Sequence, residues 1–121
     1  MTGFDSDQPR AATFAEDGWI LEDAEARHQA HPATFWIPDF SLRDNLEGGD
    51  WAKLIFLPSD QTRHTGERMW AEVEVRNGSF YRGRLLNTPV VIKQLQLNSV
   101  FWFEPHHIID TLLKSEQELD A

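Results

Sequence analysis

The residues of this sequence that are best suited to chemistry are its five histidines. His28 and His31 stand one helical turn apart, a spacing at which two imidazoles can share a zinc ion, with Glu25 near enough to be a third ligand. His31 precedes a proline at the end of the predicted helix, and the H-E-x-x-H pattern of zinc enzymes is absent. We therefore expect surface or capping histidines, with no stoichiometric metal and no other cofactor.

The other histidines fit no catalytic or metal-binding pattern. His106 and His107 are adjacent, so on a strand they point to opposite faces and cannot chelate one ion together. His64 lies in a polar loop. The sequence contains no cysteine, no G-x-S-x-G motif and no glycine-rich phosphate loop. We therefore expect a protein that is not an enzyme.

Two carboxylates, Glu72 and Glu74, share one face of a predicted strand, as an acid and base pair requires. They belong to the stretch 67–87, ERMWAEVEVRNGSFYRGRLLN, in which apolar and polar residues alternate on both sides of Asn77-Gly78. A period of two favours half-buried strands, and Asn-Gly is the strongest short signal for a hairpin turn. This hairpin is the element around which we expect the chain to pack.

Charge pairing sets the expected register of this hairpin. A three-residue loop, 77–79, places opposite charges across from each other, and such cross-strand pairs contribute roughly 0.2–1 kcal/mol each. A bulge beside the turn would reconcile this register with the usual two-residue turn. The expected opposite pairs are Val75 with Tyr81, Glu74 with Arg82, Val73 with Gly83, Glu72 with Arg84 and Ala71 with Leu85. The two carboxylates are then partners of arginines rather than a catalytic pair.

The outer face of this predicted sheet carries the candidate binding residues. Side chains alternate between the two faces of a strand, and the candidates occupy the outward positions. In the last strand Trp102 is expected to point outward, because Phe101 and Phe103 are expected to point inward. An exposed patch of this kind would anchor a partner, since buried tryptophans dominate many interfaces. In the alternative, the N-terminal segment buries the face through Trp19, Phe35 or Trp36, because soluble monomers rarely expose a large apolar patch. The candidates are Trp70, Phe80, Trp102, Arg82 and Arg84.

A nucleic-acid platform is the alternative for this face. Residues 76–103 contain four bases and no acid, and bases among aromatic side chains are typical of surfaces that bind single strands. The net charge of −9 opposes phosphate, and the acids lie directly across the hairpin. We therefore rank nucleic acid below a protein partner. The four bases are Arg76, Arg82, Arg84 and Lys93.

Length and composition indicate one globular domain. The chain has 121 residues, of which 40% are hydrophobic and 12% aromatic, enough for a single core. Residues 1–50 carry 11 of the 20 acids but only 3 of the 11 lysines and arginines. No basic and apolar leader and no run of 18 apolar residues is present, so we expect a cytoplasmic protein without a membrane segment.

Periodicity and turn residues predict the order of the elements. Besides the hairpin, we expect a helix at 22–30, an edge or extended segment at 34–38, a short helix at 42–47, strands at 51–57 and 100–103, brief pairing at 90–92 and a terminal helix within 110–118.

These elements suggest a mobile arm (1–15), a single domain (16–112) and an acidic tail (113–121). Short strands in series favour an α+β fold, either a small antiparallel sheet or an SH3-like β-barrel, with the N-terminal helix packed on it.

Short motifs over about residues 18–110 carry a family resemblance. They are Glu67-Arg68-Met69-Trp70, Tyr81-x-Gly83-x-Leu85-x-Asn87-x-Pro89, Leu95-x-Leu97, Phe101-x-Phe103-x-Pro105-x-x-Ile108, His31-Pro32-x-Thr34-Phe35-x-Ile37-Pro38 and Gly49-Asp50-x-x-Lys53-Leu54. Together they resemble the YegJ-like family of uncharacterised bacterial domains of unknown function. Asn98-Ser99 stands where that family usually has a Gly-Asp or Gly-Gln turn. The resemblance implies no established activity or catalytic residue.

The acidic charge and the aromatic outer face together suggest a function. We expect a non-enzymatic protein-binding domain, of the type of an inhibitor or immunity protein, which masks a basic partner such as a nuclease. The alternative is a small β-barrel that binds nucleic acid.

Overall fold

The computed structural model describes residues 8–60 and 66–119. Within them the chain forms one antiparallel sheet, in which neighbours follow the order β1-β2-β3-β4-β5 and β6 also pairs with β2. The strands are β1 (Trp19–Leu21), β2 (Trp51–Pro58), β3 (Glu67–Asn77), β4 (Phe80–Leu85), β5 (Val100–Phe103) and β6 (Ile108–Leu112).

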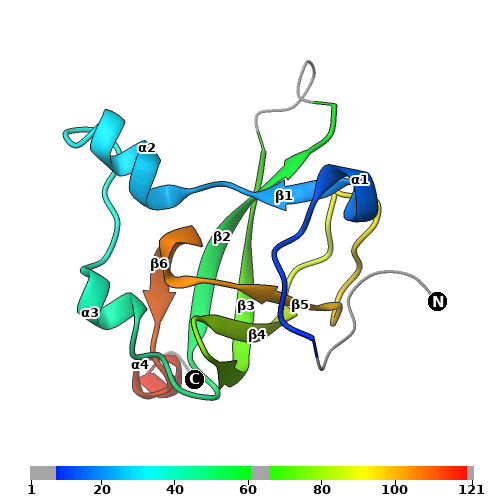
Figure 1. Cartoon of the computed structure of the whole chain (residues 1–121). Coiled ribbons are helices and arrows are strands. Elements are labelled where there is room, and N and C mark those ends of the chain that lie inside the picture. Colours follow the sequence, from blue (N-terminus) through cyan, green and yellow to red (C-terminus); the bar gives the residue numbers. More distant parts are fainter. Residues whose placement is uncertain (1–7, 61–65, 120–121) are drawn as a thin grey trace.

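β2 is the central strand of the sheet and pairs with three other strands. One of its edges pairs with β3, and the other pairs first with β6 along residues 51–54 and then with β1 along residues 56–58. The sheet is curled into a half-barrel, with β4 and β5 crossing in front of β2 and β3 in Figure 1. The expected α+β class and the small antiparallel sheet are thereby confirmed.

Short helices link these strands. α1 follows Thr13, whose hydroxyl accepts a hydrogen bond from the backbone N–H of Glu16, and α2 follows Asp23, which caps Ala26 in the same way. Helices this short are marginal in isolation, so tertiary packing must hold them. They are α1 (Phe14–Asp17), α2 (Ala24–Ala30), α3 (Phe40–Arg43), the 3₁₀ turn η1 (Pro105–His107) and α4 (Lys114–Leu119).

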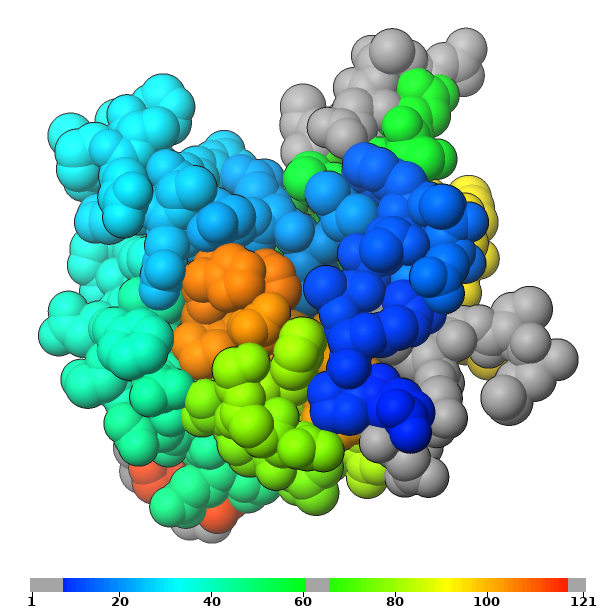
Figure 2. All heavy atoms as spheres, viewed as in Figure 1, coloured from blue at the N-terminus to red at the C-terminus, as the bar shows by residue number. Residues whose placement is uncertain are grey.

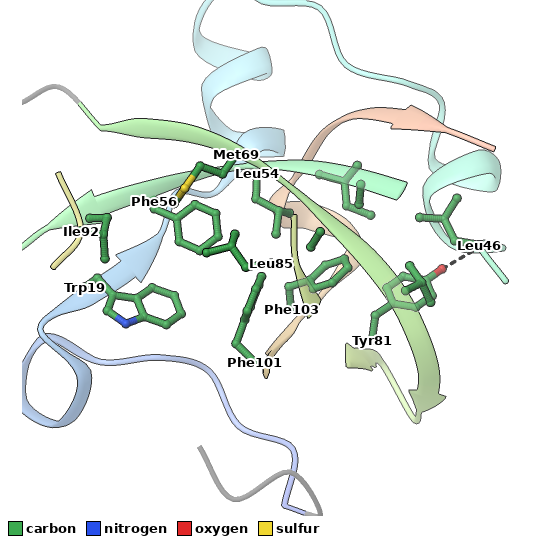
Figure 3. Packing of buried hydrophobic residues seen from close by; sticks show 14 residues of the cluster. Trp19, Leu46, Leu54, Phe56, Met69, Tyr81, Leu85, Ile92, Phe101 and Phe103 are labelled. Carbon is green, nitrogen blue, oxygen red and sulfur yellow. Dashed lines mark hydrogen bonds between the residues drawn. The ribbon is translucent and has the colours of Figure 1, made fainter. Parts of the chain in front are cut away.

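The inner face of the sheet holds the main core, shown in Figure 3. Trp19 from β1 packs on Phe56 of β2, and Phe101 of β5 meets both rings at centroid distances of 5.9 and 5.4 Å. The buried Tyr81 hydroxyl donates to the carbonyl of Arg43 and accepts from the N–H of Leu46. Residues 43–46 are thus tied to the hairpin.

The hairpin register is confirmed along most of its length. Ala71 lies opposite Leu85, and Val73 lies opposite Gly83. The expected ion pairs join Glu72 to Arg84 at 3.0 Å and Glu74 to Arg82 at 3.1 Å. Both glutamates are therefore paired with arginines, as expected.

At the turn, the expected register is wrong by one residue. The ladder shifts between Val73 and Val75, so Val75 lies opposite Arg82 instead of Tyr81. The connection is the two residues Gly78-Ser79, not the three residues 77–79. The anticipated bulge therefore reconciles charge pairing with a two-residue turn, but it also leaves Val75 44% exposed.

Three further expectations need correction. Residues 90–92 pair with no described strand, because their N–H groups bind the Glu67 carboxylate at 2.6, 2.9 and 3.0 Å. The short helix expected at 42–47 is α3, whose last residue is Arg43. The terminal helix begins at Lys114, since residues 108–112 continue the sheet as β6.

The described N-terminal residues are docked on the fold. Arg10 donates to both carboxylate oxygens of Asp17, at 2.8 and 2.9 Å, and the N–H of Thr13 adds a third bond. Burial opposes ionisation of Asp17, yet these hydrogen bonds lower the pKa of its carboxyl. Figure 2 shows this segment in blue against β4 and the orange residues around β5. Residues 1–7 of the expected mobile arm lie outside the described part of the chain.

Candidate functional site

A pocket of about 540 Å³ opens on the outer side of the sheet, between β2, β3, β6 and the segment that follows α2. Three of its lining residues carry a permanent positive charge and one carries a carboxylate. This local excess of positive charge contrasts with the net charge of −9 for the whole chain. The lining residues are Arg27, His31, Thr34, Phe35, Trp36, Lys53, Arg68, Ile109 and Asp110.

A second apolar cluster supports the pocket. Ile55 of β2 points away from the main core and packs with Phe35, Ile37, Ile109 and the fully buried Ala24 of α2. Alanine at this position lets α2 approach the sheet closely. The cluster therefore fixes α2 and the segment 35–37 against the strands that supply the charges.

Phe35 lies between two of the cationic side chains. The guanidinium carbon of Arg27 is 4.5 Å from the Phe35 ring centroid, and that of Arg68 is 6.0 Å away. Contacts of this kind contribute about 0.5–1 kcal/mol at exposed sites. Arg27 also meets Glu22 at 3.2 Å, so its charge is partly offset.

Lys53 supplies the third cation. Its Nζ lies 5.6 Å from the ring centroid of Trp70, which stands opposite Lys53 in the β2–β3 ladder. Across the other ladder Lys53 faces Asp110, whose Oδ1 accepts a hydrogen bond from the N–H of Thr111. Among the residues the structure describes, neither Lys53 nor Arg68 forms an ion pair.

Buried polar contacts hold the wall of the pocket in place. His28 Nδ1 lies 2.6 Å from the carbonyl oxygen of Phe35, and because a carbonyl only accepts, this nitrogen carries the proton. Arg43, which is buried, donates to the carbonyls of Pro38 and Pro105 and to the Glu25 carboxylate. These bonds fix both ends of the segment 35–38.

Trp36 stands on the rim of this fixed wall. Its neighbours Phe35 and Ile37 are buried, whereas Trp36 is 71% exposed. A large apolar side chain held outward by a rigid backbone loses little entropy on binding, so it is well suited to contact a partner. The pocket therefore combines positive charge with an adjacent exposed aromatic ring.

The candidate residues predicted from the sequence do not form one patch. Trp102 does point away from the core residues Phe101 and Phe103, but it is only 2% exposed. Phe80 packs edge-on against it at 6.5 Å. Arg82 and Arg84 are engaged with glutamates of β3. Of the two alternatives for this face, the covered one applies to Trp102, whereas a role in binding for these five residues stays a prediction.

Trp70 lies in a separate cluster, on the pocket side of the outer face. β3 and β5 are not neighbours, because β4 runs between them, so Trp70 does not reach Trp102. Its ring packs against Trp51 at 6.3 Å and faces Lys53. Trp70 thus contacts the pocket residue Lys53.

The histidines take local structural roles. His28 supports the pocket wall, and His107 Nδ1 accepts a hydrogen bond from the N–H of Glu104. Burial, together with the neighbouring His106, lowers the pKa of His107 to about 3. No group of three or more possible metal ligands occurs among the described residues, and His64 lies outside them.

Sequence reasoning missed the pocket because its cations come from separate elements. Arg27 belongs to α2, Lys53 to β2 and Arg68 to β3. The available signal was parity, since Lys53 and Arg68 occupy outward positions on strands that an antiparallel connection brings together. Five lining residues also belong to the motifs that carry the YegJ-like resemblance: His31, Thr34, Phe35, Lys53 and Arg68.

No family model, curated protein or solved structure matches the chain. The resemblance to YegJ-like domains therefore remains a prediction from the quoted motifs. In the part of the chain that the structure describes, no helix is both long and apolar enough to span a bilayer.

Proposed function

We propose that this protein is a non-enzymatic protein-binding domain, and that its pocket receives an anionic group from the partner. The observation that supports this is the convergence of Arg27, Lys53 and Arg68 on one cavity beside the exposed ring of Trp36. Lys53 and Arg68 form no ion pair among the described residues. A ligand that carries negative charge would therefore provide the ion-pair partner for both side chains.

The partner surface that would enter the pocket is anionic, whereas the acidic composition of the chain suggested a basic partner. A basic partner would be repelled at the pocket, because opposite charges across an interface are what favours association. Other acidic residues lie outside the pocket, for example Asp39 just before α3 and Asp44 and Glu47 after it. A second cavity, of about 640 Å³, has Glu47 and Asp50 beside Lys114 in its lining, and masking of a basic partner there remains a prediction.

Selection of binding peptides from a random displayed library tests the proposed function. We expect the wild-type protein to enrich peptides with an acidic residue next to an aromatic or aliphatic one. The charge-reversal variant R68E should lose these peptides, since it places a carboxylate at the pocket. Replacing Trp36 with Ala should weaken them about tenfold, in the range typical of an interfacial tryptophan.

The matched control is K93E, because Lys93 is an exposed cation outside the pocket and the charge change is the same. It should retain the peptides selected by the wild type. Equal binding of those peptides to wild type and R68E would contradict the proposal. So would a selection in which only basic peptides are enriched.

A further inference from the structure

We infer that the anionic group is a phosphomonoester dianion held next to an apolar or aromatic group. This inference rests on the proposed function and adds the chemical class of the ligand. The charge of the pocket, the hydrogen-bond donors that line it and the position of Trp36 support this ligand.

The lining of the pocket carries an excess of positive charge, which favours an anionic ligand. Arg27, Lys53 and Arg68 outnumber Asp110, so the permanently charged lining residues carry an excess of two positive charges at neutral pH. A phosphomonoester carries about −1.5 to −2 at that pH, whereas a carboxylate carries one negative charge. Glu22 lies 3.2 Å from Arg27 and offsets part of this excess, so the donors favour a phosphoryl group more than the formal charge does.

The donors also suit a tetrahedral group with three terminal oxygens. Two guanidinium groups can each present paired N–H donors to phosphate oxygens, and Lys53 adds an ammonium. Thr34 contributes a hydroxyl to the same lining. Because both guanidinium groups rest near the Phe35 ring, part of the cost of ordering them is met before a ligand arrives.

A polyanion fits the surroundings less well than one isolated phosphoryl group. Glu22 lies at 3.2 Å from Arg27, and the next row of the outer face carries the ion pair Glu72–Arg84. A nucleic-acid strand that enters the pocket would have to pass these carboxylates in a chain of net charge −9. Trp36 lines the pocket and is 71% exposed, so it is accessible to the group that bears the phosphate.

Isothermal titration with phenyl phosphate, phenyl sulfate and benzoate tests the inference. The sulfate ester has the shape of the phosphate but one negative charge, so it isolates the effect of the dianion. We expect phenyl phosphate to bind about tenfold more tightly than either monoanion, with a loss of affinity as salt is raised. Equal affinities for the three probes would overturn the inference.

Variants connect the binding to the pocket. R68Q and K53Q should each weaken phenyl phosphate about tenfold while leaving the urea midpoint near that of the wild type, because neither side chain has an ion pair among the described residues. K93Q should bind like the wild type. Undiminished phenyl phosphate binding by the double variant R68Q/K53Q would place the ligand elsewhere and contradict the inference.

A third experiment distinguishes a phosphate carried by a protein from a free phosphomonoester. A peptide with a phosphotyrosine between apolar residues should bind about tenfold more tightly than phenyl phosphate if the phosphate is carried by a protein, since Trp36 would contact the flanking residue. Equal affinity would indicate a free phosphomonoester. If acidic peptides are selected but phenyl phosphate binds no more tightly than phenyl sulfate and benzoate, this inference is overturned and the proposed function stands.

Discussion

Gly83 of β4 lies against the ring of Phe103 from β5. A Cβ built on Gly83 would lie 2.6 Å from Cε1 of Phe103 and 3.2 Å from the Cβ of Ala71. Phe103 is fully buried and packs on Tyr81 at a centroid distance of 5.4 Å, so its ring has little room to move. The absence of a side chain at Gly83 thus leaves room for the Phe103 ring.

Replacing Gly83 with Ala should therefore destabilise the protein by about 1–3 kcal/mol, the usual cost of overpacking a core. Urea denaturation measures the change. The control is G78A, whose Cβ would meet nothing within 4 Å but whose φ of 62° is unfavourable for alanine. It should cost about 1 kcal/mol. A G83A variant no less stable than G78A would contradict the expected clash.

At the scale of elements, several segments are held by polar contacts rather than by strand pairing. Glu67 at the start of β3 holds residues 90–92 through three backbone N–H groups. Arg43 joins α3 to α2 and η1. The wall of the candidate pocket depends on Arg43, since this side chain also donates a hydrogen bond to the Pro38 carbonyl.

Replacing Glu67 with Ala should release the segment around residues 90–92 and reduce the free energy of unfolding by about 2 kcal/mol, because hydrogen bonds to a charged acceptor are stronger than neutral ones. Hydrogen exchange of the Val91 and Ile92 amides should accelerate. E74Q removes only the partly exposed ion pair with Arg82, so it should cost less than about 1 kcal/mol. Unchanged exchange at Val91 and Ile92 in E67A would argue against the clamp.

At the scale of the whole molecule, the acidic chain has an unevenly distributed charge and a stability that depends on pH. The cationic pocket lies on the outer face, whereas the aromatic core fills the inner one. His107 is buried with its Nδ1 accepting a hydrogen bond from the N–H of Glu104, and a protonated ring would lose that bond. Folding therefore excludes a proton that the unfolded chain accepts.

The pKa of His107 falls from 6.5 to about 3 on folding. Between these values the unfolded state binds a proton that the native state does not, so stability rises with pH and is lost as pH falls through this window. The slope should be about 1.4 kcal/mol per pH unit. H107Q, which keeps an acceptor for the Glu104 N–H, should flatten it in urea titrations. H106Q should retain the slope over a narrower pH window, because burial contributes more than His106 to the lowered pKa. An unaltered slope in H107Q would refute the assignment.

The sequence by itself determined the hairpin, most of its register and the α+β class. A period of two, an Asn-Gly turn and opposite charges that face each other are local signals, because a strand and its hairpin partner are close along the chain. The bulge at Glu74 was anticipated, but its effect on Val75 and on the length of the turn was not.

Only the tertiary structure decided which outward side chains are accessible and which cations meet. Parity along a strand gives the direction of Trp102, but its burial depends on segments distant in sequence. In the same way, Arg27, Lys53 and Arg68 converge only because β2 pairs with β3 while an apolar cluster holds α2 and Phe35 on the sheet. Periodicity carries information over a few residues, whereas this pocket joins residues from Arg27 to Asp110 by long-range packing.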